Sequence, residues 1–212
     1  MTIHWSLFVP GILLLLYPAD RLLSSLVELR SFDCFHSLAN SPRYRPWWWV
    51  PVLWLDPMRG FAGTWLLQQA LGVASVTWAA VPKPEYVLLV AILGLAVLCQ
   101  TFTRRGDQGV LLAPMGFVGG LTVALTPLPV ALIGLVTAAL GLFAFRQFHA
   151  FFAVGLVGVA LLGVVLGTGA MWLGPAAGAF VLPIIAGLVT GSTLEVPTRN
   201  ASGRVPPPKV NA

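Results

Sequence analysis

Long apolar runs, separated by short polar or proline-rich segments, dominate the chain. A transmembrane helix needs about 17 to 25 mostly apolar residues, because the hydrocarbon core of a bilayer is about 30 Å thick. Six runs come close to that length and are predicted to be the main spans, several of them at its short end. These runs cover residues 61–81, 86–102, 110–125, 130–145, 151–169 and 173–190.

A seventh apolar run, residues 3–17, is shorter and is interrupted by Pro10 and Gly11. Such a run fits a short span, a re-entrant segment or the apolar part of a signal peptide. No Lys or Arg precedes it and no clear cleavage site follows it, so a retained, kinked seventh helix is preferred. The predicted fold class is therefore an all-α, polytopic transmembrane helix bundle that forms one membrane domain, residues 1–191.

The composition supports this prediction. Of 212 residues, 58% are apolar and 9% are charged, whereas about a quarter of the residues of an ordinary soluble domain are charged. A soluble enzyme is therefore excluded, and we expect no nucleic-acid partner. The two cysteines and the 22 glycines, which have no fixed period, also argue against disulfide-stabilised and collagen-like folds.

The segment between the first two runs, residues 18–57, is predicted to lie at the membrane interface. Residues 20–38 have apolar side chains at helical spacing, which is typical of an amphipathic surface helix. Residues 43–55 combine arginine with tryptophan, which suits the headgroup region. We expect either an ordinary aromatic belt or a platform that contacts lipid or a partner protein. The side chains concerned are Arg43, Arg45, Trp47, Trp48, Trp49 and Trp54.

Polar residues flank the next two spans. Asp56 followed by Pro57 indicates the start of a helix, with an N-cap and then proline at the first helical position. Arg59 is placed to pair with Asp56 across the first turn, and the pair would also suit a lipid headgroup. Capping is the preferred interpretation. Arg104 and Arg105 lie in the loop of residues 103–108 and are interpreted as cytoplasmic anchors of the kind that set topology. Together with Asp56 and Arg59, they are also candidate contacts for lipid or a partner protein.

The basic residues predict the orientation of the chain. If successive loops alternate between the two sides of the membrane, one side receives eleven of the twelve Lys and Arg residues and the other only Lys83. Basic loops stay in the cytoplasm, so the C-terminus is predicted to be cytoplasmic in a bacterial inner (plasma) membrane. Residues 192–212 are predicted to be a disordered, proline-rich cytoplasmic tail.

Glycines four residues apart recur in the last spans. In lipid, small residues at this spacing let helices approach closely, and intrachain packing is favoured over a dimer seam. The predicted packing residues are Gly116 with Gly120, Gly163 with Gly167, Gly174 with Gly178, and Gly187 with Gly191.

Candidate chemistry is sparse. Asp33, Cys34 and His36 lie close together, and Cys99 and His149 are expected near the same membrane face. No Cys-x-x-Cys motif and no helical histidine pair accompanies them, so neither a metal nor a cofactor is predicted. The six main spans contain no Asp, Glu, Lys or Arg away from their ends, which argues against a proton-driven pump.

Three functions remain open. The leading hypothesis is a non-enzymatic integral subunit or scaffold, without catalytic residues, that docks membrane lipid or a partner membrane protein at its cytoplasmic face. The first alternative is a facilitator for an uncharged or lipidic solute. It needs a polar cavity near Gln68, Gln69 and Gln100. The second alternative is a membrane-embedded enzyme acting on lipid headgroups. Its candidate residues are Asp56, Arg59, Arg104 and Arg105.

Overall fold

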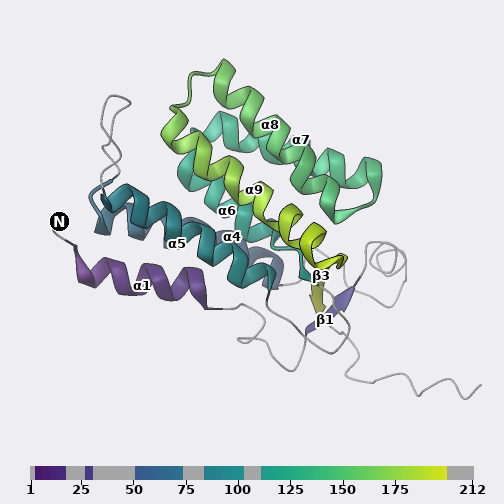
Figure 1. Cartoon of the computed structure of the whole chain (residues 1–212), viewed down its shortest axis with the longest axis horizontal. Coiled ribbons are helices and arrows are strands. Elements are labelled where there is room, and N and C mark those ends of the chain that lie inside the picture. The colour runs from purple at the N-terminus through teal and green to yellow at the C-terminus, as the bar shows by residue number, and fades with distance from the viewer. Residues whose placement is uncertain (1–2, 18–26, 31–50, 74–83, 103–110, 200–212) are drawn as a thin grey trace, which may run out of the picture.

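The structure of the chain is a computed structural model that describes residues 3–17, 27–30, 51–73, 84–102 and 111–199. Within these residues the chain forms seven helices and one three-stranded sheet (Figure 1). The helices are α1 (Trp5–Leu16), α4 (Pro51–Ala70), α5 (Pro84–Thr101), α6 (Met115–Leu125), α7 (Leu128–Phe145), α8 (Phe148–Val165) and α9 (Ala170–Thr190). The strands are β1 (Val27–Arg30), β2 (Leu111–Leu112) and β3 (Leu194–Arg199).

Four of the helices in this part of the chain, α5, α7, α8 and α9, are long and apolar enough to cross a membrane. This supports a transmembrane helical protein, but it does not confirm six main spans. Helices α1 and α6 are apolar but have 12 and 11 residues, which is short for a crossing. Helix α4 has 20 residues and is interrupted by polar side chains such as Asp56 and Arg59.

The predicted span 61–81 is misplaced. Helix α4 begins ten residues earlier, at Pro51, and ends at Ala70. It stops there because Gly72 adopts a left-handed conformation with φ of 62°, and Val73 N–H donates to the Gln68 carbonyl. Asp56 and Pro57 therefore lie inside the helix, so the predicted N-cap at Asp56 is wrong. Residues 74–81 of the predicted span lie outside the described residues.

The predicted span 110–125 is also too long. Its helical part, α6, starts only at Met115, with Pro114 as the N-cap residue. A residue that precedes proline disfavours the helical conformation, so Ala113 is a natural limit for the helix. Leu111 and Leu112 instead form strand β2. By contrast, α1, α5, α7, α8 and α9 coincide with predicted runs, with ends that differ by at most four residues.

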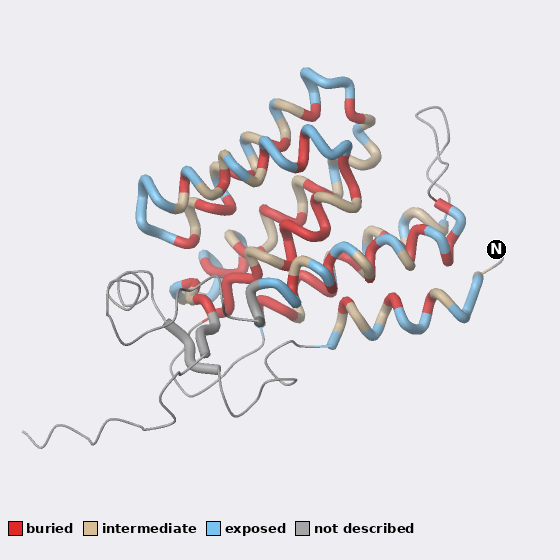
Figure 2. Tube along the Cα trace, turned by 180° about the vertical axis from the view of Figure 1, so that it is seen from behind, coloured by how far each residue is buried: buried red, intermediate tan, exposed pale blue. Residues whose placement is uncertain are grey.

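The bundle is built around the short helix α6, whose Phe117, Val118 and Leu121 are fully buried. Helix α4 packs between α6 and α1, while α9 contacts α5, α6 and α8. Helices α7 and α8 form an antiparallel hairpin at one edge of the bundle, and α1 lies at the opposite edge (Figure 1). Exposed residues follow the outer faces of these edge helices (Figure 2).

The small sheet brings together three segments that are distant in sequence. Strand β3 is central, antiparallel to β1 and parallel to β2, in the order β1-β3-β2. Leu194 and Val196 of β3 are buried, and Glu195 between them is partly exposed. Residues 194–199 of the predicted disordered tail therefore form an ordered strand. Residues 200–212 lie outside the described residues.

The two ends of the bundle differ in charge. We call the sheet end the one where α1, α5, α7 and α9 end, on the side of the three strands, and the far end its opposite (Figure 1). Of the eight charged residues in the described part of the chain, Glu85 alone lies at the far end. The seven at the sheet end are Glu28, Arg30, Asp56, Arg59, Arg146, Glu195 and Arg199.

Candidate functional site

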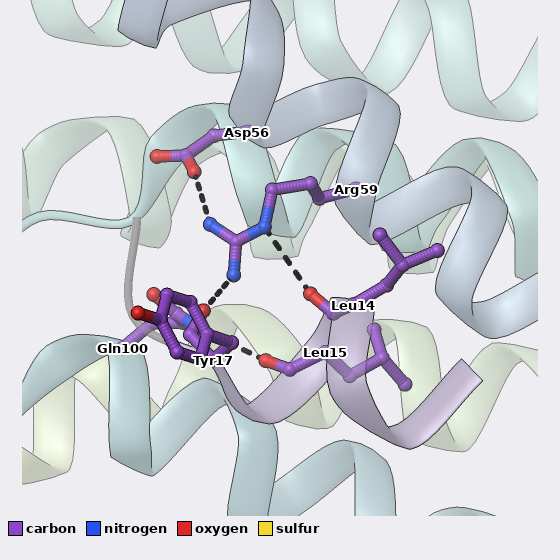
Figure 3. Close-up of polar contacts among 6 residues, drawn as sticks. All are labelled: Leu14, Leu15, Tyr17, Asp56, Arg59 and Gln100. Carbon is purple, nitrogen blue, oxygen red and sulfur yellow. Dashed lines mark hydrogen bonds and ion pairs between the residues drawn. The ribbon is translucent and has the colours of Figure 1, made fainter. Parts of the chain in front are cut away.

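Buried polar side chains gather around the C-terminal end of α1. Asp56 and Arg59 come from α4 and Gln100 from α5 (Figure 3). These residues are only 9%, 4% and 3% exposed. We call these three residues the cap cluster. The last carbonyl groups of a helix have no partner within the helix, so buried carbonyls at this position need donors from elsewhere.

Arg59 supplies donors to this helix end. Its Nε donates to the Leu14 carbonyl at 3.2 Å, and its Nη2 donates to the Tyr17 carbonyl. Its Nη1 forms an ion pair with Asp56 Oδ1 at 3.0 Å, so the pair that the sequence suggested between these residues is present. A cation is also favourable here because the C-terminal end of a helix carries a partial negative charge.

Gln100 completes the arrangement from the third helix. Its Nε2 donates to the Leu15 carbonyl at 2.9 Å and to the Tyr17 carbonyl at 3.2 Å (Figure 3). The cap cluster therefore joins α1, α4 and α5 through side-chain donors and backbone acceptors. An isolated buried guanidinium would be strongly unfavourable, and Asp56 compensates its charge. This geometry holds α4 and α5 against the C-terminal end of α1.

Glycine lets α4 and α6 touch at the backbone next to this cluster. A Cβ atom at Gly120 would lie 2.1 Å from the Pro57 carbonyl oxygen, and one at Gly116 would lie 2.9 Å from Pro57 Cδ. On the other helix, a Cβ atom at Gly60 would lie 2.4 Å from the Phe117 carbonyl oxygen. Gly116 and Gly120 thus both face the contact with α4.

In the other predicted glycine pairs, the two glycines do not both contact a neighbouring helix. A Cβ atom at Gly163 would lie 2.4 Å from Leu173 Cδ1, and one at Gly187 would lie 2.7 Å from His149 Nε2. Their partners, Gly167 and Gly191, lie beyond the ends of α8 and α9 and have φ of 68° and 62°. They allow helix termination, so packing on a helix face is not their role. Gly174 and Gly178, by contrast, have no atom within 4 Å of a built Cβ.

Several glycines at helix contacts have other spacings. Gly134 and Gly141 of α7, seven residues apart, meet Val159 and Val154 of α8, and a Cβ atom at either would come within 2.6 Å of them. Gly63 of α4 faces Leu15 of α1. A seven-residue spacing also keeps residues on one helix face, so these contacts have a sequence signal that the four-residue glycine spacing does not include.

An apolar groove of about 500 Å³ lies between α5, α6 and α9. Its lining includes Gly94, Leu121, Gly178 and Leu182, so the unoccupied faces of Gly174 and Gly178 open into it. Tyr86 lines the groove close to the far end of the bundle, and its hydroxyl donates to the Met171 carbonyl. The groove can accommodate an apolar group, but its lining offers little to bind a polar one.

The glutamines predicted for a polar cavity do not share one. Gln68 donates to the Ala124 carbonyl at 3.3 Å, Gln69 is exposed, and Gln100 belongs to the cap cluster. Trp54 is exposed on the first turns of α4. The remaining predicted contact residues lie outside the described residues. They are Arg43, Arg45, Trp47, Trp48, Trp49, Arg104 and Arg105.

Within the described ranges, no group of three or more His, Cys, Asp or Glu side chains is placed to hold a metal ion. Asp33, Cys34 and His36 fall outside those ranges. Comparison of the chain with protein-family models, with curated proteins and with solved structures finds no match.

Proposed function

We propose that the protein is a non-enzymatic integral membrane subunit or scaffold, which docks membrane lipid or a partner membrane protein at its sheet end. The observation that carries this proposal is the cap cluster. Its carboxylate, guanidinium and amide are buried and engaged with each other or with backbone carbonyls. These groups join helices, so they are not presented to a substrate.

The outer surface supports a membrane location. Side chains such as Leu140 on α7, Val164 on α8 and Val189 on α9 are more than 60% exposed although they are apolar. Apolar surface of this extent is compatible with lipid and unfavourable in water. The concentration of charge at one end agrees with cytoplasmic placement of the sheet end, since basic residues are retained on that side.

The two alternative functions receive less support. A facilitator for an uncharged solute needs a polar-lined cavity, whereas Gln68 and Gln100 donate to backbone carbonyls and the groove is apolar. An enzyme acting on headgroups needs an accessible carboxylate, and Asp56 is buried beside Arg59. The groove does favour a lipidic ligand, which keeps a facilitator for lipidic solutes as the second candidate.

Purification of the intact chain in native lipid, followed by mass spectrometry of everything that stays bound, tests the proposal. A scaffold is expected to retain a partner protein in fixed stoichiometry or a defined lipid class. The variant Trp54→Ala removes an exposed aromatic residue near the sheet end and should reduce what is retained, whereas Leu166→Ala at the far end should not. A lone monodisperse protein with no retained partner or lipid contradicts the proposal.

A further inference from the structure

Exposed residues recur along α1 at the edge of the bundle (Figure 2), and four of them form an apolar stripe. Trp5, Val9, Leu13 and Tyr17 are 65%, 49%, 60% and 45% exposed and follow one another at intervals of four residues. Residues at this spacing lie on the same helix face. The whole helix, Trp5–Leu16, contains no charged side chain.

The two ends of this stripe have the chemistry of membrane interfaces. Trp5 stands at the N-terminal end and Tyr17 follows the C-terminal end, with aliphatic Val9 and Leu13 between them. Tryptophan and tyrosine are enriched at both headgroup levels of a bilayer, where an aromatic ring meets lipid and its polar atom meets water. The stripe therefore has the residue pattern of a complete bilayer crossing, with an aromatic residue at each end, although α1 has only 12 residues.

Polar contacts mark the same two levels independently. At the sheet end Arg59, which is paired with Asp56, donates to the Leu14 and Tyr17 carbonyls, and this places charge at the level of Tyr17. At the far end α4 stops at Ala70, whose carbonyl accepts a hydrogen bond from His4 N–H at 3.0 Å. On this edge of the bundle, α1 and the apolar part of α4 therefore both extend from the position of Tyr17 at the sheet end to that of His4 at the far end.

The opposite edge of the bundle is longer. Helices α7 and α8 have 18 residues each, and exposed apolar side chains extend along α7 from Leu128 to Phe145. At 1.5 Å per residue, helices of 18 and 12 residues are about 27 Å and about 18 Å long. The edges that carry them lie on opposite sides of the bundle (Figure 1).

We propose that α1 forms a short lipid-facing edge, beside which the bilayer thins relative to the α7–α8 edge. The partner of this surface is the bilayer itself, with short or disordered acyl chains packed against Val9 and Leu13. The inference rests on the proposed membrane location. A hydrophobic segment shorter than the hydrocarbon core is accommodated by local thinning at a modest cost in free energy per ångström. The hydrocarbon core of the bilayer would therefore be thinner beside α1 than beside α7 and α8 on the opposite side of the protein.

Spin-label depth measurements on the full chain in phosphatidylcholine bilayers test this proposal. In a Cys34→Ser, Cys99→Ala background that keeps the parent circular dichroism, single cysteines carry a nitroxide, and collisions with oxygen and with a water-soluble nickel chelate report depth. The α1 series is Trp5→Cys, Val9→Cys, Leu13→Cys and Tyr17→Cys. The matched α7 series is Leu128→Cys, Leu132→Cys, Val136→Cys, Leu140→Cys and Phe145→Cys.

Labels at 5 and 17 should both report headgroup depth, and labels at 9 and 13 should report hydrocarbon. The two headgroup crossings on α1 should lie about 9 Å closer together than those on α7. Equal separations, or a nickel-accessible label at position 13, overturn the inference. Labels on α1 shielded from both reagents overturn it too, because protein would then cover this edge. If the α7 series itself lies in water, the proposed membrane location fails instead.

Discussion

At the scale of single residues, the C-terminal end of α1 shows how a charge can be tolerated inside a helix bundle. Arg59 has a carboxylate and two backbone carbonyls within reach of its guanidinium. Removing one partner of a buried ion pair is far more harmful than removing both, because an uncompensated charge remains. Arg59 is only 4% exposed, so we expect its contribution to be to the stability of the fold.

We expect Arg59→Met to lower the free energy of unfolding by about 3–5 kcal/mol, since Asp56 and the Leu14 carbonyl lose their donors. Thermal unfolding in mild detergent, followed by circular dichroism, measures the loss. Arg146→Met is the matched control, because Arg146 is exposed in the turn between α7 and α8. Similar unfolding temperatures for the two variants contradict this account of the cap cluster.

Gln100→Leu should lower the free energy of unfolding by about 1–3 kcal/mol, because the buried Leu15 carbonyl loses its side-chain donor. Gln69→Leu makes the same chemical change at an exposed position of α4 and is expected to have little effect. The same unfolding assay compares them. An effect of Gln69→Leu as large as that of Gln100→Leu would contradict the stabilising role assigned to the buried hydrogen bond of Gln100.

At the scale of elements, the contact between α4 and α6 depends on the absence of side chains. Gly60, Gly116 and Gly120 bring the two helices to backbone contact, and Pro57 fills the remaining space. Apolar attraction between helices is weak in lipid, so close packing provides most of their association. The position of α4 in turn fixes Asp56 and Arg59 at the end of α1.

Gly120→Ala is expected to destabilise the bundle by about 1–3 kcal/mol, because its Cβ would lie 2.1 Å from the Pro57 carbonyl oxygen. Gly178→Ala adds the same methyl group to a helix where no atom lies within 4 Å. It should be neutral or slightly stabilising, since alanine favours the helix over glycine. Unfolding temperatures of the two variants decide the matter, and equal losses would refute the packing argument.

At the scale of the whole molecule, the separation of charge between the two ends predicts one orientation. Glu85 lies in the first turn of α5, at the far end, and Arg146 follows the C-terminal end of α7, at the sheet end. In whole cells, Glu85→Cys should react with a membrane-impermeant thiol reagent, and Arg146→Cys should react only after lysis. The parent chain with its native cysteines gives the background. Modification of Arg146→Cys in intact cells would reverse the proposed orientation.

The sequence by itself determined the helical character of the chain and its affinity for a membrane. Long apolar runs have few other stable conformations, because every backbone polar group in lipid must be satisfied within the structure. Five runs accordingly coincide with α1, α5, α7, α8 and α9. The ion pair of Asp56 and Arg59 was also visible, since residues three apart meet on one helix face.

Only the tertiary structure decided where α4 begins, which glycines meet a neighbour, and what the polar residues do. Gly120 and Gly178 have the same motif, but one opposes Pro57 and the other opens into a groove. Gln100 became a helix cap because α1, 83 residues or more away in sequence, ends beside it. Strand β3 likewise exists through pairing with two distant segments. Such contacts depend on the relative placement of elements, which local residue patterns do not encode.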